Sequence, residues 1–156
     1  MTTTTEAQLP PEVVALLDGR RLEDKDGMAF VLMTTGDHGW PHAALLSVGE
    51  VLARSPGDVA LALHRTSGTT ANLTRTGRAT LLVIAPPVAY TVRLDVRPGA
   101  GGADAPLARF TAGVAAVIRH EVPYAELTAP IAFRLADPAA AHERWAATLG
   151  DLRAGG

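Results

Sequence analysis

The stretch AYTVRLDVR, residues 89–97, constrains the fold of this chain more than any other. Apolar side chains occupy every second position from Tyr90 to Val96, and polar or charged side chains occupy the positions between them. Because successive side chains of a strand point to opposite faces of a sheet, this alternation predicts a strand with one buried and one solvated face. Such strands are typical of antiparallel sheets.

Other segments predict further strands around this one. The apolar runs on either side of GDHG, within residues 27–52, predict a hairpin, because Asp and Gly suit a tight turn. A loop rich in glycine and proline joins the alternating strand to the next apolar run and predicts a second hairpin. The remaining strands are expected at residues 58–65, 78–85, 107–118 and 126–136.

Three short helices are expected, one at the start, one in the middle and one at the end of the chain. Helical spacing of leucine and valine predicts the first within residues 9–19, and Gly77 ends the second, at residues 69–76. Asp137 and Pro138 form an N-cap and first turn for the last helix. Its expected apolar stripe comprises Ala141, Trp145, Leu149 and Leu152.

The order of these elements predicts an α+β fold, with six or seven antiparallel strands forming a barrel flanked by short helices. Strand and helix do not alternate regularly, which excludes a doubly wound parallel sheet. A chain of 156 residues suits one domain, expected at residues 9–153, behind a disordered leader at residues 1–8.

Composition excludes several classes of function. A net charge of -2 and 4% aromatic residues argue against nucleic-acid binding. The absence of cysteine removes disulfides and thiolate metal sites, so a redox function would need a bound cofactor. The five histidines lack metal-ligand spacing, and no metal site or catalytic residue is predicted. No apolar segment is long enough to cross a membrane, so a cytoplasmic location is expected.

The segment HRTSGTT, residues 64–70, has two interpretations. It lies where a strand ends and a helix begins, so hydroxyls and free backbone N–H groups meet at the positive end of a helix dipole and could bind a phosphate. Alternatively, Ser67 or Thr69 caps the helix and the other side chains face water. The residues alone leave both interpretations open.

The order of motifs resembles the pyridoxamine 5'-phosphate oxidase-like FMN-binding split-barrel family. These motifs are a hairpin containing GWPH, a third strand, a hydroxyl-rich turn, a helix containing NL and a strand beginning GRATL, over residues 24–136. The resemblance implies a homodimer with an FMN site at each interface, or the deazaflavin F420 as in a related subgroup. The cofactor-binding residues it implies are Ala44, Leu45, Leu46, Ser47, His64, Arg65, Thr66, Ser67, Thr69, Thr70 and Asn72.

The chain also departs from the oxidase that gives the family its name. His42 and Ser47 stand where that enzyme has the two cations of its second strand, and Ser67, Gly68 and Thr69 replace its S-R-K turn. Arg65 and the hydroxyls would have to compensate for the missing charge. The oxidase's own activity is therefore not expected.

Three hypotheses remain on the sequence alone. The first is an FMN- or F420-dependent oxidoreductase acting on an unidentified small molecule. The second is a non-catalytic barrel that binds a flavin, haem or another small ligand. The third is a purely structural dimerisation domain.

Overall fold

A computed structural model describes residues 2–155 of the chain. The helices are α1 (Pro11–Leu17), α2 (Gly68–Thr76), α3 (Pro138–Ala154) and the short 3-10 helix η1 (Leu22–Asp24). The strands are β1 (Thr2–Glu6), β2 (Met28–Thr35), β3 (Pro41–Leu46), β4 (Val51–Ser55), β5 (Asp58–His64), β6 (Arg78–Ala85), β7 (Val88–Pro98), β8 (Leu107–His120) and β9 (Ile131–Ala132).

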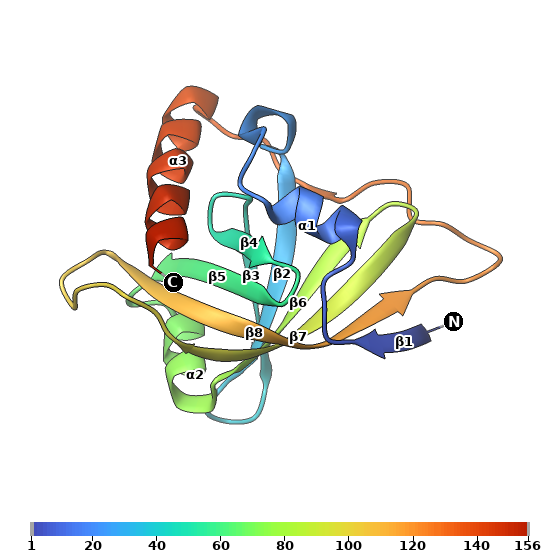
Figure 1. Cartoon of the computed structure of the whole chain (residues 1–156), viewed down its shortest axis with the longest axis horizontal. Coiled ribbons are helices and arrows are strands. Elements are labelled where there is room, and N and C mark those ends of the chain that lie inside the picture. The colour runs from blue at the N-terminus through green and yellow to red at the C-terminus, as the bar shows by residue number, and fades with distance from the viewer. Residues whose placement is uncertain (1, 156) are drawn as a thin grey trace.

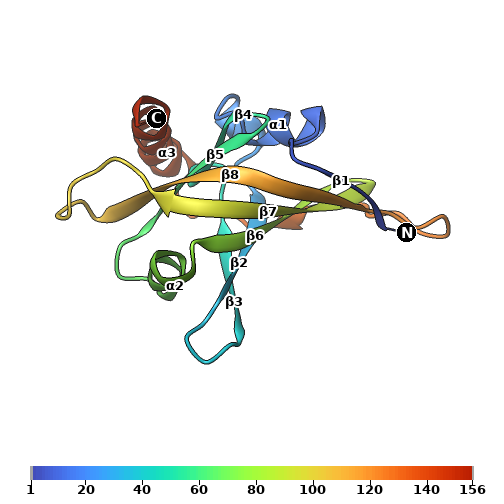
Figure 2. The same ribbon diagram turned by 60° about the horizontal axis from the view of Figure 1, so that its bottom comes forward.

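Seven strands form one curled antiparallel sheet in the order β3-β2-β6-β7-β8-β5-β4 (Figures 1 and 2). Strands β3 and β4 follow one another in the sequence but lie at opposite ends of this order. The sheet is therefore a half-barrel that is open between them. Together with the three α-helices, it confirms the predicted α+β split barrel.

The core lies on the inner face of the sheet. Tyr90, Val92 and Leu94 of β7 are at most 2% exposed, whereas Arg93 and Asp95 between them are exposed. The predicted alternation is therefore confirmed. A buried side chain of this size contributes about 1.5–3 kcal/mol relative to its exposed state, so this strand strongly favours the observed face.

Helix α3 covers the end of the sheet formed by β4 and β5 (Figure 1). Its N-cap is Asp137, whose carboxylate accepts a hydrogen bond from the Ala140 N–H at 3.1 Å. The expected apolar stripe is buried against the sheet. Both predictions for this helix are confirmed. Among the described residues, no helix combines the length and the apolar character needed to cross a bilayer.

The structure differs from the sequence prediction at three strands. Thr2–Glu6, inside the expected disordered leader, form β1 and pair with β8, because threonine favours extended backbone and the end of β8 offers free backbone groups. β4 was expected to belong to the first hairpin, but a turn at residues 47–50 separates it from β3. The last strand is only Ile131–Ala132, because β3 and β6 pair with the rest of β2.

Candidate cofactor-binding site

The turn between β5 and α2 is held by its own hydroxyl groups. Ser67 is the N-cap of α2, and its Oγ accepts a hydrogen bond from the Thr70 N–H at 3.1 Å. The Thr70 hydroxyl donates to the His64 carbonyl at 2.7 Å. The cap at Ser67 that the second interpretation predicted is therefore confirmed, but Thr69 and Thr70 are buried and do not face water as that interpretation expected. Two of the hydroxyls predicted to contact a cofactor also hold the turn.

Two backbone N–H groups in the first turn of α2 remain free. The N–H groups of Gly68 and Thr69 have no hydrogen-bond acceptor among residues 2–155. Thr69 is 3% exposed, and its hydroxyl, which is not fully buried, makes no hydrogen bond with any described residue. Free N–H groups at a helix N-terminus carry partial positive charge and bind anions.

His42 of β3 lies against this turn. A Cβ atom placed on Gly68 would be 3.5 Å from Cε1 and 3.7 Å from Nε2 of the His42 imidazole. His42 is exposed, so both solvent and a ligand can reach the ring. We call Gly68, Thr69 and His42 the β5–α2 corner. This corner brings the His42 imidazole close to the two free backbone N–H groups.

Arg65 does not face the β5–α2 corner in this structure. Its Nε donates to the Ala105 carbonyl at 2.6 Å, and its Nη2 donates to the carbonyls of Gly102 and Leu107 at 2.9 Å and 3.3 Å. These bonds fasten the loop between β7 and β8 to the end of β5. The sequence predicts that Arg65 replaces the cations missing from the family pattern. In the structure, however, its guanidinium is already hydrogen-bonded to the loop between β7 and β8.

Asn72 is also engaged within the protein. Its Nδ2 donates to Thr34 Oγ1 at 3.0 Å, and its Oδ1 accepts from Arg75 Nη1 at 3.3 Å. Asn72 is 6% exposed, and its bond to Thr34 joins α2 to β2, whereas the bond from Arg75 lies within α2. His64 and Thr66, in contrast, are exposed beside the turn.

The predicted residues of the second strand divide between two faces of β3. Leu46 is buried in the core, Ala44 is half-buried, and Leu45 points outward and is 67% exposed. Trp40, just before the strand, is 78% exposed. β3 is the edge strand of the sheet, so its outer backbone groups and the Leu45 side chain are available to a ligand or a partner.

Ser47 lies at the end of β3 in the turn to β4. Its N–H donates to Glu50 Oε2 at 3.1 Å, and its Oγ accepts from the Gly49 N–H at 3.2 Å. Burial raises the pKa of the Glu50 carboxyl, while the hydrogen bonds from Ser47 and the charge of His64 act in the opposite direction.

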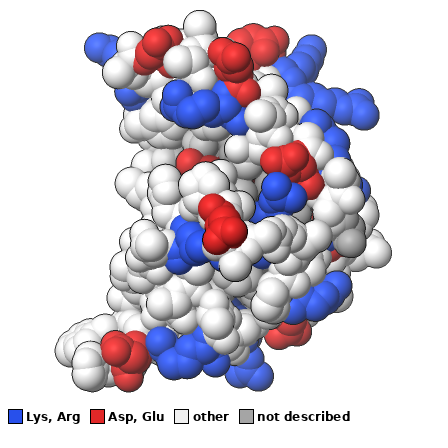
Figure 3. All heavy atoms as spheres, turned by 90° about the vertical axis from the view of Figure 1, so that its left-hand side faces the viewer, with Lys and Arg blue, Asp and Glu red and all other residues white. Residues whose placement is uncertain are grey.

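The structure thus brings part of the predicted set together. The turn residues 64–70 are consecutive and lie together, and His42 of β3 lies next to Gly68 in this turn. From the sequence, His42 is identified only as the residue that stands where the named oxidase has a cation, although the motif GWPH marks its position. Basic and acidic side chains are interspersed on the face shown in Figure 3, without a single basic patch.

Comparison with known proteins gives one close relative. No family model matches the chain. The chain is 39% identical over 140 residues to the uncharacterized protein YclD of Bacillus subtilis (strain 168), an alignment that covers 88% of this chain and 91% of YclD. The chain belongs to the YclD family.

Solved structures relate this YclD-family chain to the expected fold. It matches a putative pyridoxamine 5'-phosphate oxidase from Lactobacillus delbrueckii subsp. with a TM-score of 0.55 at 14% identity, over 75% of this chain and 98% of that one. It matches an FMN-binding protein from Syntrophomonas wolfei subsp. wolfei with a TM-score of 0.51 at 13% identity, over 69% and 88% of the two chains. The predicted resemblance to pyridoxamine 5'-phosphate oxidase-like split barrels is confirmed as a likeness of fold.

Proposed function

We propose that this member of the YclD family binds FMN at the β5–α2 corner and acts as an FMN-dependent oxidoreductase on a small molecule. The observation that carries the proposal is the pair of free N–H groups on Gly68 and Thr69 beside the His42 imidazole. They lie in the turn where the family resemblance expects the cofactor phosphate.

The β5–α2 corner suits a phosphate group in its chemistry. Two N–H donors at the positive end of a helix dipole and the ring N–H of His42 could share the oxygen atoms of a dianion. Gly68 has no side chain that could cover the two N–H donors. Even a Cβ atom at this position would lie 3.5 Å from the nearest atom of His42, so the ring does not press on the turn. In this arrangement His42 would take the place of the arginine or lysine of the named oxidase.

The rest of the cofactor would extend along β3. The outward side of this edge strand offers backbone donors and acceptors and the exposed Leu45 side chain. Bound FMN would supply the hydride chemistry, and the chain would bind the phosphate, orient the ring and exclude water from one of its faces. We assign no acidic or basic side chain to the reaction.

A second copy of the chain would complete this site. Trp40 and Leu45 are large apolar side chains exposed on and beside an edge strand, which favours burial against a partner. A homodimer formed there would cover the outward face of β3. Each cofactor would then lie between two protomers.

Spectroscopic titration tests the proposal. The purified protein is titrated with FMN, F420 and haemin, and the variant His42→Gln is compared with the wild type. Saturable FMN binding is expected, and bound FMN should be reduced by a reduced nicotinamide and reoxidised by an added acceptor. His42→Gln should weaken FMN binding.

Other outcomes separate the alternatives. Tighter binding of F420 would assign the deazaflavin in place of FMN. Haemin binding alone, or bound FMN that passes no electrons to any acceptor, would replace the oxidoreductase by a ligand-binding barrel. Absence of binding to all three would refute the proposal.

A further inference from the structure

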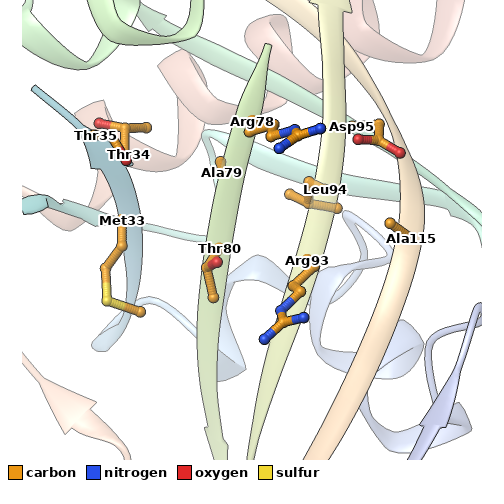
Figure 4. Close-up of a pocket in the computed structure, with 10 residues that line it drawn as sticks. All are labelled: Met33, Thr34, Thr35, Arg78, Ala79, Thr80, Arg93, Leu94, Asp95 and Ala115. Atoms are coloured by element: carbon orange, nitrogen blue, oxygen red, sulfur yellow. The ribbon is translucent and has the colours of Figure 1, made fainter. Parts of the chain in front are cut away.

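A second polar site lies on the outer face of the sheet. Strands β2, β6, β7 and β8 border a groove of about 290 Å³ there (Figure 4). Six of its lining residues matter for its chemistry: Met33, Arg78, Thr80, Arg93, Asp95 and Ala115. None of them was singled out by the sequence analysis as a ligand-binding residue.

An irregularity in strand pairing opens this groove. Arg93 of β7 pairs with Ala116, but the next residue, Leu94, pairs with Val114, which leaves Ala115 of β8 without a partner. Such a bulge turns the extra residue out of the regular ladder. Ala115 is exposed, and its small side chain leaves room above the sheet.

The groove also carries two cations without partners. Arg78 lies opposite Asp95 and Thr80 lies opposite Arg93 in the pairing of β6 with β7. Nevertheless, Arg78, Arg93 and Asp95 make no ion pair or side-chain hydrogen bond with any residue that the structure describes. In Figure 4 the two guanidinium groups extend into the space between β6 and β7.

We propose that this groove binds the phosphate or carboxylate of a small organic anion. Arg78 and Arg93 would donate charge-assisted hydrogen bonds, which are stronger than those between neutral groups, and their planar forks match both kinds of anion. The Thr80 hydroxyl, which has no partner among the described residues, adds a neutral donor.

The remaining lining residues define the rest of the ligand. Met33 on β2 and Ala115 on β8 lie at opposite sides of the groove and give it apolar walls that suit a small hydrocarbon or aromatic body between them (Figure 4). The Asp95 carboxylate in the groove would accept a hydrogen bond from a donor group of the ligand and would repel additional negative charge. The groove therefore suits a compact ligand with one anionic group. This proposal does not depend on the proposed FMN site.

The test is a titration of the full chain with phenyl phosphate and with benzoate, monitored by NMR through the backbone amide resonances. Either probe should give saturable shifts at residues 78–80 and 93–95, and the tighter probe identifies phosphate or carboxylate as the natural group. Arg93→Gln and Arg78→Gln should each raise the dissociation constant at least tenfold.

Arg97→Gln is the matched control, because Arg97 is exposed on the same face of β7 but does not line the groove. Its dissociation constants should stay within twofold of the wild type. Arg78 and Arg93 are exposed, so their variants should keep the wild-type melting temperature. Absence of saturable shifts with both probes, or equal weakening by all three substitutions, would overturn the proposal.

Discussion

Replacing Arg65 by alanine separates a role in folding from a role in cofactor binding. The side chain makes three hydrogen bonds to the carbonyls of Gly102, Ala105 and Leu107, and those to Ala105 and Leu107 are partly buried. A hydrogen bond from a charged donor contributes about 1.5–3 kcal/mol when both groups lose access to water. Because this loop regains water when the guanidinium is removed, we expect the free energy of unfolding to fall by about 2 kcal/mol in total.

Urea unfolding measures this loss, with the fluorescence of the buried Trp145 as the probe. With an m value of about 2 kcal/mol per molar urea, the midpoint should fall by about 1 M. Arg97→Ala removes an exposed side chain that makes no hydrogen bond with any described residue, so it should change the unfolding free energy by less than about 0.5 kcal/mol. The affinity of Arg65→Ala for FMN should remain near the wild-type value.

The opposite pattern would refute this reasoning. If Arg65→Ala kept the wild-type urea midpoint and lost FMN binding, the guanidinium would serve the cofactor phosphate and not the loop. The sequence interpretation of Arg65 would then hold against the structural one.

Three further predictions concern the turn after β3 and the edge strand. Gly49→Ala places a Cβ atom 2.0 Å from the indole of Trp145, so α3 must shift and thermal unfolding should show a loss of about 2 kcal/mol or more; an unchanged melting temperature would contradict the packing. Burial raises the pKa of the Glu50 carboxyl, so its stabilising contribution is present below the ordinary carboxyl pKa of about 4.3 and is lost as pH rises through the raised value. Glu50→Gln should therefore resist urea better than the wild type at pH 8 but not at pH 4, and equal behaviour at both pH values would argue against the burial. Leu45→Glu should make the protein monomeric in sedimentation experiments while changing monomer stability little, because the side chain is 67% exposed; a persistent dimer would place the interface elsewhere.

Elements with a strong local pattern were predictable from the sequence. The alternation in β7 fixed its inner face, and the Asp137–Pro138 pair fixed the start of α3. The cap at Ser67 was one of two interpretations of the same turn. Each of these features depends on residues within a few positions of one another, so the local sequence is enough to predict it.

Features that depend on distant pairing were not predictable. The partner of the Arg65 guanidinium lies about 40 positions away, and nothing near Arg65 marks it. The break between β3 and β4 lacks a proline or a conspicuous turn sequence, so the two strands read as one apolar run. The contact of His42 with Gly68 and the groove beside Ala115 arise from sheet curvature and a bulge, which alternation does not encode.

The amide resonances of Gly68 and Thr69 give the most direct test of how this chain would hold a cofactor. Titration with FMN should shift both resonances, whereas riboflavin, which has the same ring but no phosphate, should leave them nearly unchanged. Equal shifts with the two ligands, or FMN shifts confined to residues 78–80 and 93–95, would contradict the account of the β5–α2 corner.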